Sequence, residues 1–140
     1  MAFVSTYLNF DGTTEAAFTF YASVFGTEFT APIVRMGEAP HAATLSEAEQ
    51  QLVMHVSLPI IGGHILMGTD MVRSQGHELR QGNNISLSID LDSRAEADRL
   101  YQALAEGGSE GTGMFDAPWN AYWGTTLDRF GIRWMFHAPN

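Results

Sequence analysis

Apolar and polar residues alternate along two stretches of the chain, and this pattern predicts two β-strands. In the first stretch, Leu8 and Phe10 fall on one side and Tyr7 and Asn9 on the other. The second stretch, residues 84–91, repeats the alternation, with an apolar side made of Ile85, Leu87, Ile89 and Leu91. Successive side chains of a strand point to opposite faces. The apolar side of each strand is therefore expected to face a helix.

A helix is predicted after each of these strands. Residues 14–25 (TEAAFTFYASVF) have apolar residues at helical spacing and end at Gly26; the expected buried face is Ala17, Phe20, Tyr21 and Val24. Residues 95–106 (AEADRLYQALAE) have the same spacing, with the face Ala97, Leu100, Tyr101 and Leu104. The run Ser93-Arg94-Ala95-Glu96 is a capping box that predicts the start of the second helix.

The two halves also resemble each other in sequence. With an offset of 81 residues, residues 5–11 align with 86–92, and Gly26 aligns with Gly107. Three strand-like runs follow each helix, at about 28–36, 52–60 and 63–69, and at about 110–115, 121–128 and 131–138. We therefore predict one α+β domain, residues 1–140, made of two βαβββ modules at about 1–72 and 82–140, with a curved mixed sheet around a cavity.

Turns and loops complete this outline. Tight turns are predicted at Gly62-Gly63 and at residues 129–131. Two polar segments remain, residues 37–51, with a helical turn at 46–50, and residues 70–84, which are expected to link the modules. Either segment could cover a site.

Composition narrows the possible functions. The chain has 140 residues, no cysteine and a formal charge of −9, which excludes thiolate chemistry and argues against a nucleic-acid surface. The acidity fits a cationic ligand, but a protein that uses charge to stay in solution is the stronger interpretation. Neither a membrane span nor a signal peptide is expected, so we predict a cytoplasmic protein.

Several stretches carry a family resemblance: YLNFDGTTEAAFTFYASVFG, MHVSLPIIGGHILMGTD, GNNISLSIDLDSRAEADRLYQALAEGG and WNAYWGTTLDRFGIRWMFH. Together they resemble the vicinal oxygen chelate superfamily, which contains glyoxalase I, extradiol dioxygenases and bleomycin resistance proteins. More narrowly, they are similar to its PhnB-like branch, often labelled demethylubiquinone methyltransferase. The resemblance implies a glyoxalase-like fold and a homodimer.

The resemblance also implies where a metal would bind. Metal-dependent members take His or Gln, Glu, His and Glu from four strands, and these positions fall near Ser5, Met67, Asn84 and Met135. None of these side chains is a good ligand for zinc, nickel or iron(II). We therefore predict no metal and no other cofactor. Met135 could instead be ordinary core beside Trp134 and Phe136, and the ligand set would still be missing.

Candidate site residues follow from the strand faces turned away from the helices. The expected ligand-binding residues are Ser5, Tyr7, Asn84, Ser86, Trp119, Tyr122 and Met135. Trp119 could stack on a flat or cationic ligand, or it could lie in a dimer contact. His137 shares a strand face with Met135, where it could reach the rim of a cavity or lie in a frayed end.

Catalytic signals are weak. His55 is predicted to lie opposite Asp70 across the hairpin, where the carboxylate could orient the imidazole as a general base or form a structural hydrogen bond. No nucleophile elbow or phosphate-binding glycine pattern occurs in the sequence. Methyl transfer from S-adenosylmethionine usually requires a larger doubly wound fold, so that activity is not supported.

Three functions remain open, and the sequence does not decide between an enzyme and a binding protein. The first is a metal-free protein that binds a small molecule. The second is sequestration of a cationic drug, as in the bleomycin resistance group. The third is a metal-dependent lyase, isomerase or dioxygenase with substitute ligands such as His55 and Asp70. No nucleic-acid or membrane partner is expected.

Overall fold

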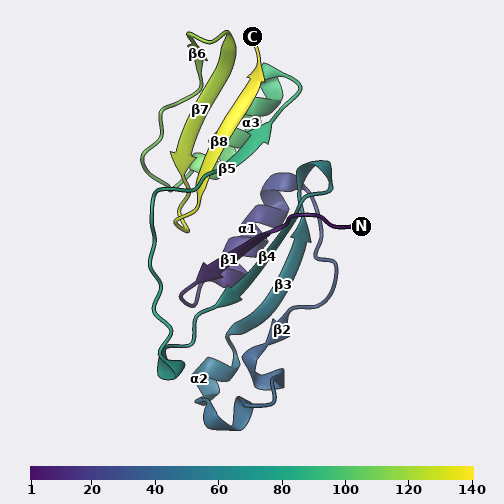
Figure 1. Ribbon diagram of the computed structural model, residues 1–140, viewed down its shortest axis with the longest axis vertical. Coiled ribbons are helices and arrows are strands. Elements are labelled where there is room, and N and C mark those ends of the chain that lie inside the picture. Colours follow the sequence, from purple (N-terminus) through teal and green to yellow (C-terminus); the bar gives the residue numbers. More distant parts are fainter. The chain divides into compact units, whose positions relative to one another are not determined.

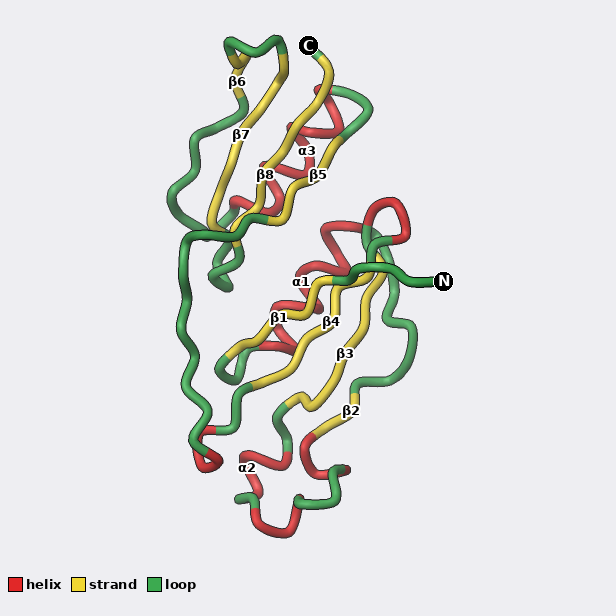
Figure 2. Tube along the Cα trace, viewed as in Figure 1, coloured by secondary structure: helices red, strands yellow, loops and turns green.

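The computed structural model describes residues 1–140, which divide into two compact units, Met1–Arg80 and Gln81–Asn140. Each unit contains one four-stranded sheet and one long helix (Figure 1). The loop between β4 and β5 links the units and is irregular apart from one short helical turn, Arg73–Gln75 (Figure 2). No helix of the chain has the length and apolar character required to span a bilayer.

The first unit has the order strand, helix, strand, strand, strand. Its elements are β1 (Thr6–Phe10), α1 (Thr14–Phe25), β2 (Val34–Arg35), the short helix α2 (Glu47–Gln50), β3 (Val53–Pro59) and β4 (Ile65–Asp70). The strands lie in the order β1-β4-β3-β2. The pair β1 and β4 is parallel, and the other two pairs are antiparallel.

The second unit repeats this topology. Its elements are β5 (Leu87–Asp90), α3 (Arg94–Ala105), β6 (Phe115–Ala117), β7 (Ala121–Leu127) and β8 (Arg133–Pro139). The order is β5-β8-β7-β6, again with one parallel pair, β5 and β8. Two βαβββ modules of identical strand order confirm the predicted α+β fold. Each sheet is open rather than closed into a barrel.

The core of the first unit lies between α1 and one face of its sheet. Phe18 and Tyr21 of the helix are fully buried, as are Leu58 and Leu66 of the sheet. A Cβ atom added to Gly68 would lie 2.5 Å from the Phe18 ring, so this ring packs directly on the strand backbone. The sequence predicts that Phe20 lies on the buried face. This prediction is wrong, because the buried face extends to Phe18, on the other side of Ala17, Tyr21 and Val24, and Phe20 is only half-buried.

The core of the second unit lies between α3 and its sheet. Leu100 and Leu104 of the helix are fully buried, with Trp134 and Phe136 of β8. Buried Asp128 accepts a hydrogen bond from Nε1 of Trp134 at 2.8 Å. Because a buried indole N–H requires an acceptor, this contact fixes the ring in the core. The prediction that Trp134 is a core residue is confirmed.

Serine side chains cap the starts of two helices, and the cap predicted at Ser93 is confirmed. The side chains of Ser93 and Ser46 accept hydrogen bonds from the amides three residues later and cap α3 and α2.

Some strands are shorter than predicted: the runs at 28–36, 84–91 and 110–115 reduce to Val34–Arg35, Leu87–Asp90 and Phe115–Ala117. Ile85, expected on an apolar strand face, lies outside β5 and is 76% exposed.

Candidate ligand-binding faces

The sheet face opposite α1 carries a row of half-buried and exposed side chains. Tyr7 of β1 is the register partner of Met67 of β4, and Met67 is the partner of Ser57 of β3. Gly68, the neighbour of Met67, packs on Phe18 of the helix, so alternation directs Met67 to the other face. An apolar thioether therefore lies between a phenol and a hydroxyl on a face that no helix of this unit covers.

The second unit has an equivalent row. Ser88 of β5 is the register partner of Met135 of β8, which is in turn the partner of Thr125 of β7. Met67 and Met135 therefore occupy the same position of the repeated topology, each in the strand that pairs with both the first and the third strand of its module. Each is half-buried.

Tyr7 also contacts a histidine on its own face. Its hydroxyl lies 3.3 Å from Nδ1 of His55, and the two ring centroids are 5.9 Å apart. Tyr7 is 46% exposed. A phenol and an imidazole at the surface of a sheet can exchange hydrogen bonds with a polar ligand.

The predicted pairing of His55 with Asp70 is wrong. Residues 60–64 form the connection between β3 and β4, and the register Val56 to Gly68 places His55 beside Thr69 instead. Asp70 lies on the opposite face, where it is buried. The same register places His55 on the face of Met67, because its neighbour Thr69 lies two residues after Met67 in β4 and alternate residues of a strand share a face.

Asp70 has a structural role in the first unit. Its Oδ1 accepts hydrogen bonds from the amides of Gly12 and Thr14 and from the Thr14 hydroxyl, and its Oδ2 accepts one from the amide of Val53 at 2.8 Å. The carboxylate thus ties the start of α1 to β3. With these four donors satisfied, Asp70 holds the backbone around the start of the helix.

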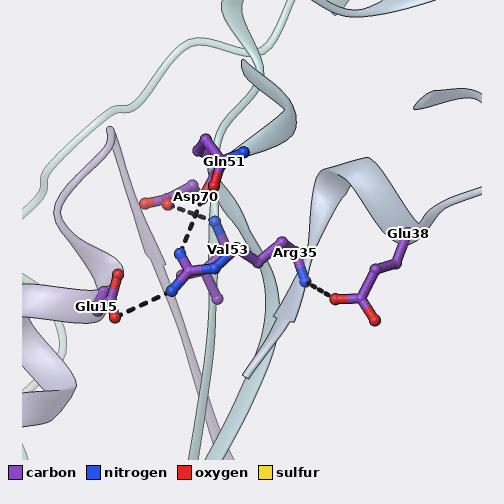
Figure 3. Close-up of polar contacts among 6 residues, drawn as sticks. All are labelled: Glu15, Arg35, Glu38, Gln51, Val53 and Asp70. Atoms are coloured by element: carbon purple, nitrogen blue, oxygen red, sulfur yellow. Dashed lines mark hydrogen bonds and ion pairs between the residues drawn. The ribbon is translucent and has the colours of Figure 1, made fainter. Parts of the chain in front are cut away.

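Arg35 extends this network at the surface (Figure 3). Its guanidinium donates to the Glu15 carboxylate at 3.1 Å and to the carbonyl of Gln51 at 2.9 Å, and its amide donates to Glu38 at 2.8 Å. The hydrogen bond to Glu15 holds the pKa of Arg35 above its usual value. These contacts fix β2 against α1 and the end of α2, at the edge of the sheet.

The second unit has an aromatic row that the sequence analysis missed in part. Phe115, Trp123, His137 and Asp90 are successive register partners across all four strands. Trp119 packs edge-on against Trp123, with ring centroids 5.5 Å apart, and is 58% exposed. His137 lies within β8, with Nδ1 3.2 Å from the Asp90 carboxylate. Trp123 could have been predicted on this face from the sequence, because it lies two residues before Thr125 in β7 and alternate residues of a strand share a face.

Tyr122 is not on this face. It is the register partner of Ala138, and its hydroxyl donates to Asp98 of α3. The guanidinium of Arg94 lies 4.2 Å from the centre of its ring. The hydrogen bond that the Asp98 carboxylate accepts from the phenol raises the pKa of Tyr122. The expectation that Tyr122 faces a ligand is corrected, because strand alternation directs it to the helix.

Three further candidate residues lie just outside the strands. Ser5 precedes β1 and is half-buried. Asn84 and Ser86 precede β5 and are exposed. Of the positions that correspond to superfamily metal ligands, only Met67 and Met135 lie within strands. No group of three or more His, Asp or Glu side chains of the chain is placed to hold a metal ion.

A small cavity of about 210 Å³ lies beside α2 in the first unit, lined by Asp11, Gly12, Ala48, Glu49, Leu52, Met71 and Arg73. The guanidinium of Arg73 donates to Asp11 and holds the pKa of that carboxyl below its usual value. Hydrogen bonds from Ser74 lower the pKa of Glu49. Both acidic residues of this cavity, Asp11 and Glu49, therefore already have hydrogen-bond partners within the chain.

Comparison with known proteins identifies the class. The fold of two βαβββ modules is that of the glyoxalase/bleomycin resistance/dioxygenase superfamily. The family model described as 3-demethylubiquinone-9 3-methyltransferase matches residues 2–136. The chain therefore belongs to this family, the PhnB-like branch of the superfamily.

Solved structures agree with this assignment. A protein from Pseudomonas aeruginosa is 31% identical, with a TM-score of 0.84 over 99% of this chain and 98% of that one. A PhnB protein from Bacillus cereus has a TM-score of 0.78 at 24% identity, over 98% and 99% of the two chains. A glyoxalase/bleomycin resistance protein/dioxygenase family enzyme from Burkholderia phytofirmans has a TM-score of 0.62 at 19% identity, over 96% and 98%. None of the curated proteins compared with the chain matches it.

Proposed function

We propose that the chain is a small-molecule-binding protein without a resident metal, and that it works as a homodimer. The repeated row carries this proposal: Tyr7, Met67 and Ser57 in the first unit, and Ser88, Met135 and Thr125 in the second. Each row offers an adaptable apolar centre flanked by hydroxyl groups. Such a combination of apolar contact with a few polar groups is typical of ligand sites.

The two methionines also support the absence of a metal. In metal-dependent members of the superfamily, carboxylates occupy the positions that correspond to Met67 and Met135. A thioether carries no charge and is a poor partner for zinc, nickel or iron(II). Two carboxylates retained on a half-buried face without a cation would be costly to desolvate. Methionine at both positions avoids that cost and supplies contact area for an organic ligand.

The proposal is tested by NMR of protein labelled with ¹³C at the methionine methyl groups. The chain has seven methionines, and variants M67L and M135L assign the two relevant signals. A library of small organic molecules is then added. We expect a binder to shift the Met67 or Met135 signal, because both methyl groups lie on the helix-free faces.

The other methionines provide matched controls in the same spectrum. Met36 is buried in a cluster with Leu45 and Val72, and Met1 is fully exposed. A true ligand leaves both signals in place. If the molecules that bind shift only signals other than Met67 and Met135, the proposed faces are wrong.

A second candidate, sequestration of a cationic drug, is favoured by one specific observation. Phe115, Trp119 and Trp123 form a partly exposed aromatic group on a chain with a formal charge of −9. Aromatic faces attract cations, and acidic charge steers them toward the protein. Titration with bleomycin should quench the tryptophan fluorescence of the chain and much less that of W119F. Equal quenching of both proteins would count against this candidate.

The proposal does not include methyl transfer, which the family description names. Transfer from S-adenosylmethionine usually uses a doubly wound α/β fold, and this chain has two βαβββ modules instead. Methylation of a quinol acceptor by the purified protein, with S-adenosylmethionine as donor, would overturn this part of the proposal.

A further inference from the structure

A second row of register partners crosses the sheet face that α3 leaves uncovered, one alternation further along the strands than Met135. It consists of Asp90, His137, Trp123 and Phe115. The neighbours Ile89 and Phe136 are buried on the helix side, and successive residues of a strand point to opposite faces. The row therefore has a carboxylate at one edge of the uncovered face and aromatic rings at the other.

The carboxylate end of this row is accessible to a ligand. The side chain of Asp90 is 83% exposed and that of His137 is 44% exposed. Nδ1 of His137 lies 3.2 Å from Oδ1 of Asp90, so the imidazole orients the carboxylate and leaves its other oxygen to accept a hydrogen bond. Such an exposed carboxylate favours a positively charged donor, of which an ammonium group is the simplest.

The other end of the row is a group of three aromatic side chains. The rings of Phe115 and Trp119 pack edge-on against Trp123, with centroids 5.6 Å and 5.5 Å from the centroid of its ring. Phe115 is 39% exposed and Trp119 is 58% exposed. Grouped aromatic side chains at a surface mark binding sites, and they bury the apolar rings of organic ligands at their edges and faces.

The first unit lacks this combination at the equivalent positions. Its row consists of Asn9, Thr69, His55 and Val34. An amide replaces the carboxylate of Asp90, and no group of aromatic rings follows. The methionine rows of the two units are alike, whereas these rows differ. The carboxylate and the rings are therefore specific to the second unit and are not required by the repeated fold.

We propose that this face of the second unit binds an arylalkylammonium ion, with its ammonium group at Asp90 and its ring against Trp123 and Trp119. Neighbouring strands lie about 4.8 Å apart, so two spacings, about 10 Å, separate the backbones of Asp90 and Trp123. The two side chains and a ligand with a two-carbon linker together span this distance. The formal charge of −9 also favours the approach of a cation. This inference rests on the proposed binding function and names the ligand class that one of its faces favours.

Three probes of similar size and different charge test this assignment: 2-phenylethylamine, 2-phenylethanol and phenylacetate. Binding is followed at the indole N–H signals of the three tryptophans in a ¹H–¹⁵N spectrum. We expect the amine to shift the Trp119 and Trp123 signals saturably, the alcohol to bind more weakly and phenylacetate to bind least. Trp134 is the internal control, because its Nε1 donates to buried Asp128 in the core.

Two variants separate recognition of the charge from recognition of the ring. D90N should weaken binding of the amine about threefold and leave binding of the alcohol unchanged, because an exposed ion pair contributes little. W123L should weaken binding of both, followed at Trp119. D92N is the matched control, because Asp92 is exposed and lies outside β5.

Three results would overturn the inference: no saturable shift at Trp119 or Trp123, equal affinity for the amine and the alcohol, or a D90N protein that binds the amine as well as D92N. The methionine methyl signals report the proposed function separately. Library molecules that shift Met67 or Met135, while the amine shifts no indole signal, would overturn this inference and leave the proposed function standing.

Discussion

Met67 is the direct register partner of Tyr7 in the parallel pair formed by β1 and β4. The second unit repeats this relationship with Met135 and Ser88. Because both methionines are half-buried on the faces that α1 and α3 leave uncovered, the duplicated topology presents an apolar group at the same place twice. This repetition is the basis of the proposed binding function.

The contact of Phe18 with the backbone of β4 predicts a severe effect of G68A. A Cβ atom at Gly68 would lie 2.5 Å from the buried Phe18 ring, which has no space to move. We expect a loss of about 1–3 kcal/mol in the free energy of unfolding, measured by urea denaturation. G82A is the matched control, because its Cβ would meet only the Asn84 side chain at 3.4 Å. Equal stability of the two variants would contradict the packing described.

The four hydrogen bonds accepted by Asp70 predict that D70N is destabilised. Asparagine keeps the size of the side chain but replaces one carboxylate oxygen with an NH₂ group. This group cannot accept a hydrogen bond from the backbone N–H that faces it. We expect a loss of about 2 kcal/mol or more in the free energy of unfolding. Asp90, whose side chain is 83% exposed, supplies the control variant D90N, which should change stability by less than about 0.5 kcal/mol. A D70N protein as stable as D90N would show that the network around Asp70 contributes little.

The position of Tyr122 against α3 is tested by a spectrophotometric titration of its phenol. Asp98 raises the pKa of Tyr122 because its carboxylate accepts a hydrogen bond from the protonated phenol, so D98N should lower that pKa. A raised pKa in the folded state stabilises the protein below the ordinary tyrosine pKa, and this contribution is lost as the pH rises through the raised value. If D98N leaves the titration of Tyr122 unchanged, the residue does not face the helix.

The ion pair of Asp11 and Arg73 predicts that its contribution to stability depends on pH in the opposite sense. Arg73 lowers the pKa of Asp11, so the contribution of the pair is present above the ordinary aspartate pKa and is lost as the pH falls through the lowered value. Variant R73Q should return the pKa of Asp11 toward its ordinary value, as followed by carboxyl NMR. R80Q serves as the control and should leave that pKa where it is.

The periodicity of the sequence was sufficient to predict most of the fold. The predicted bounds of the helix at Thr14–Phe25 agree with the structure, because apolar spacing and the glycine at Gly26 both define it. The two modules follow from the alternation in their first strands. Periodicity could not distinguish Phe18 from Phe20 as the buried ring, because the two residues lie on either side of the apolar stripe formed by Ala17, Tyr21 and Val24.

The candidate site was harder to predict, because it depends on strand register. A two-residue turn at Gly62-Gly63 pairs His55 with Asp70, whereas the observed connection through residues 60–64 shifts the partner by one residue and changes its face. Tyr122 was misplaced for a similar reason. Its strand directs Gly124 and Thr126 to the helix side, and alternation places Tyr122 with them.

The central claim is that the chain binds an organic molecule and holds no metal, and a native mass spectrum of the untagged protein tests it most directly. The spectrum reports the number of subunits, any bound metal and any small molecule that copurifies. We expect a dimer that is free of transition metal and carries an organic mass. A stoichiometric transition metal would contradict the account, because Met67 and Met135 could then not stand at the positions of its ligands.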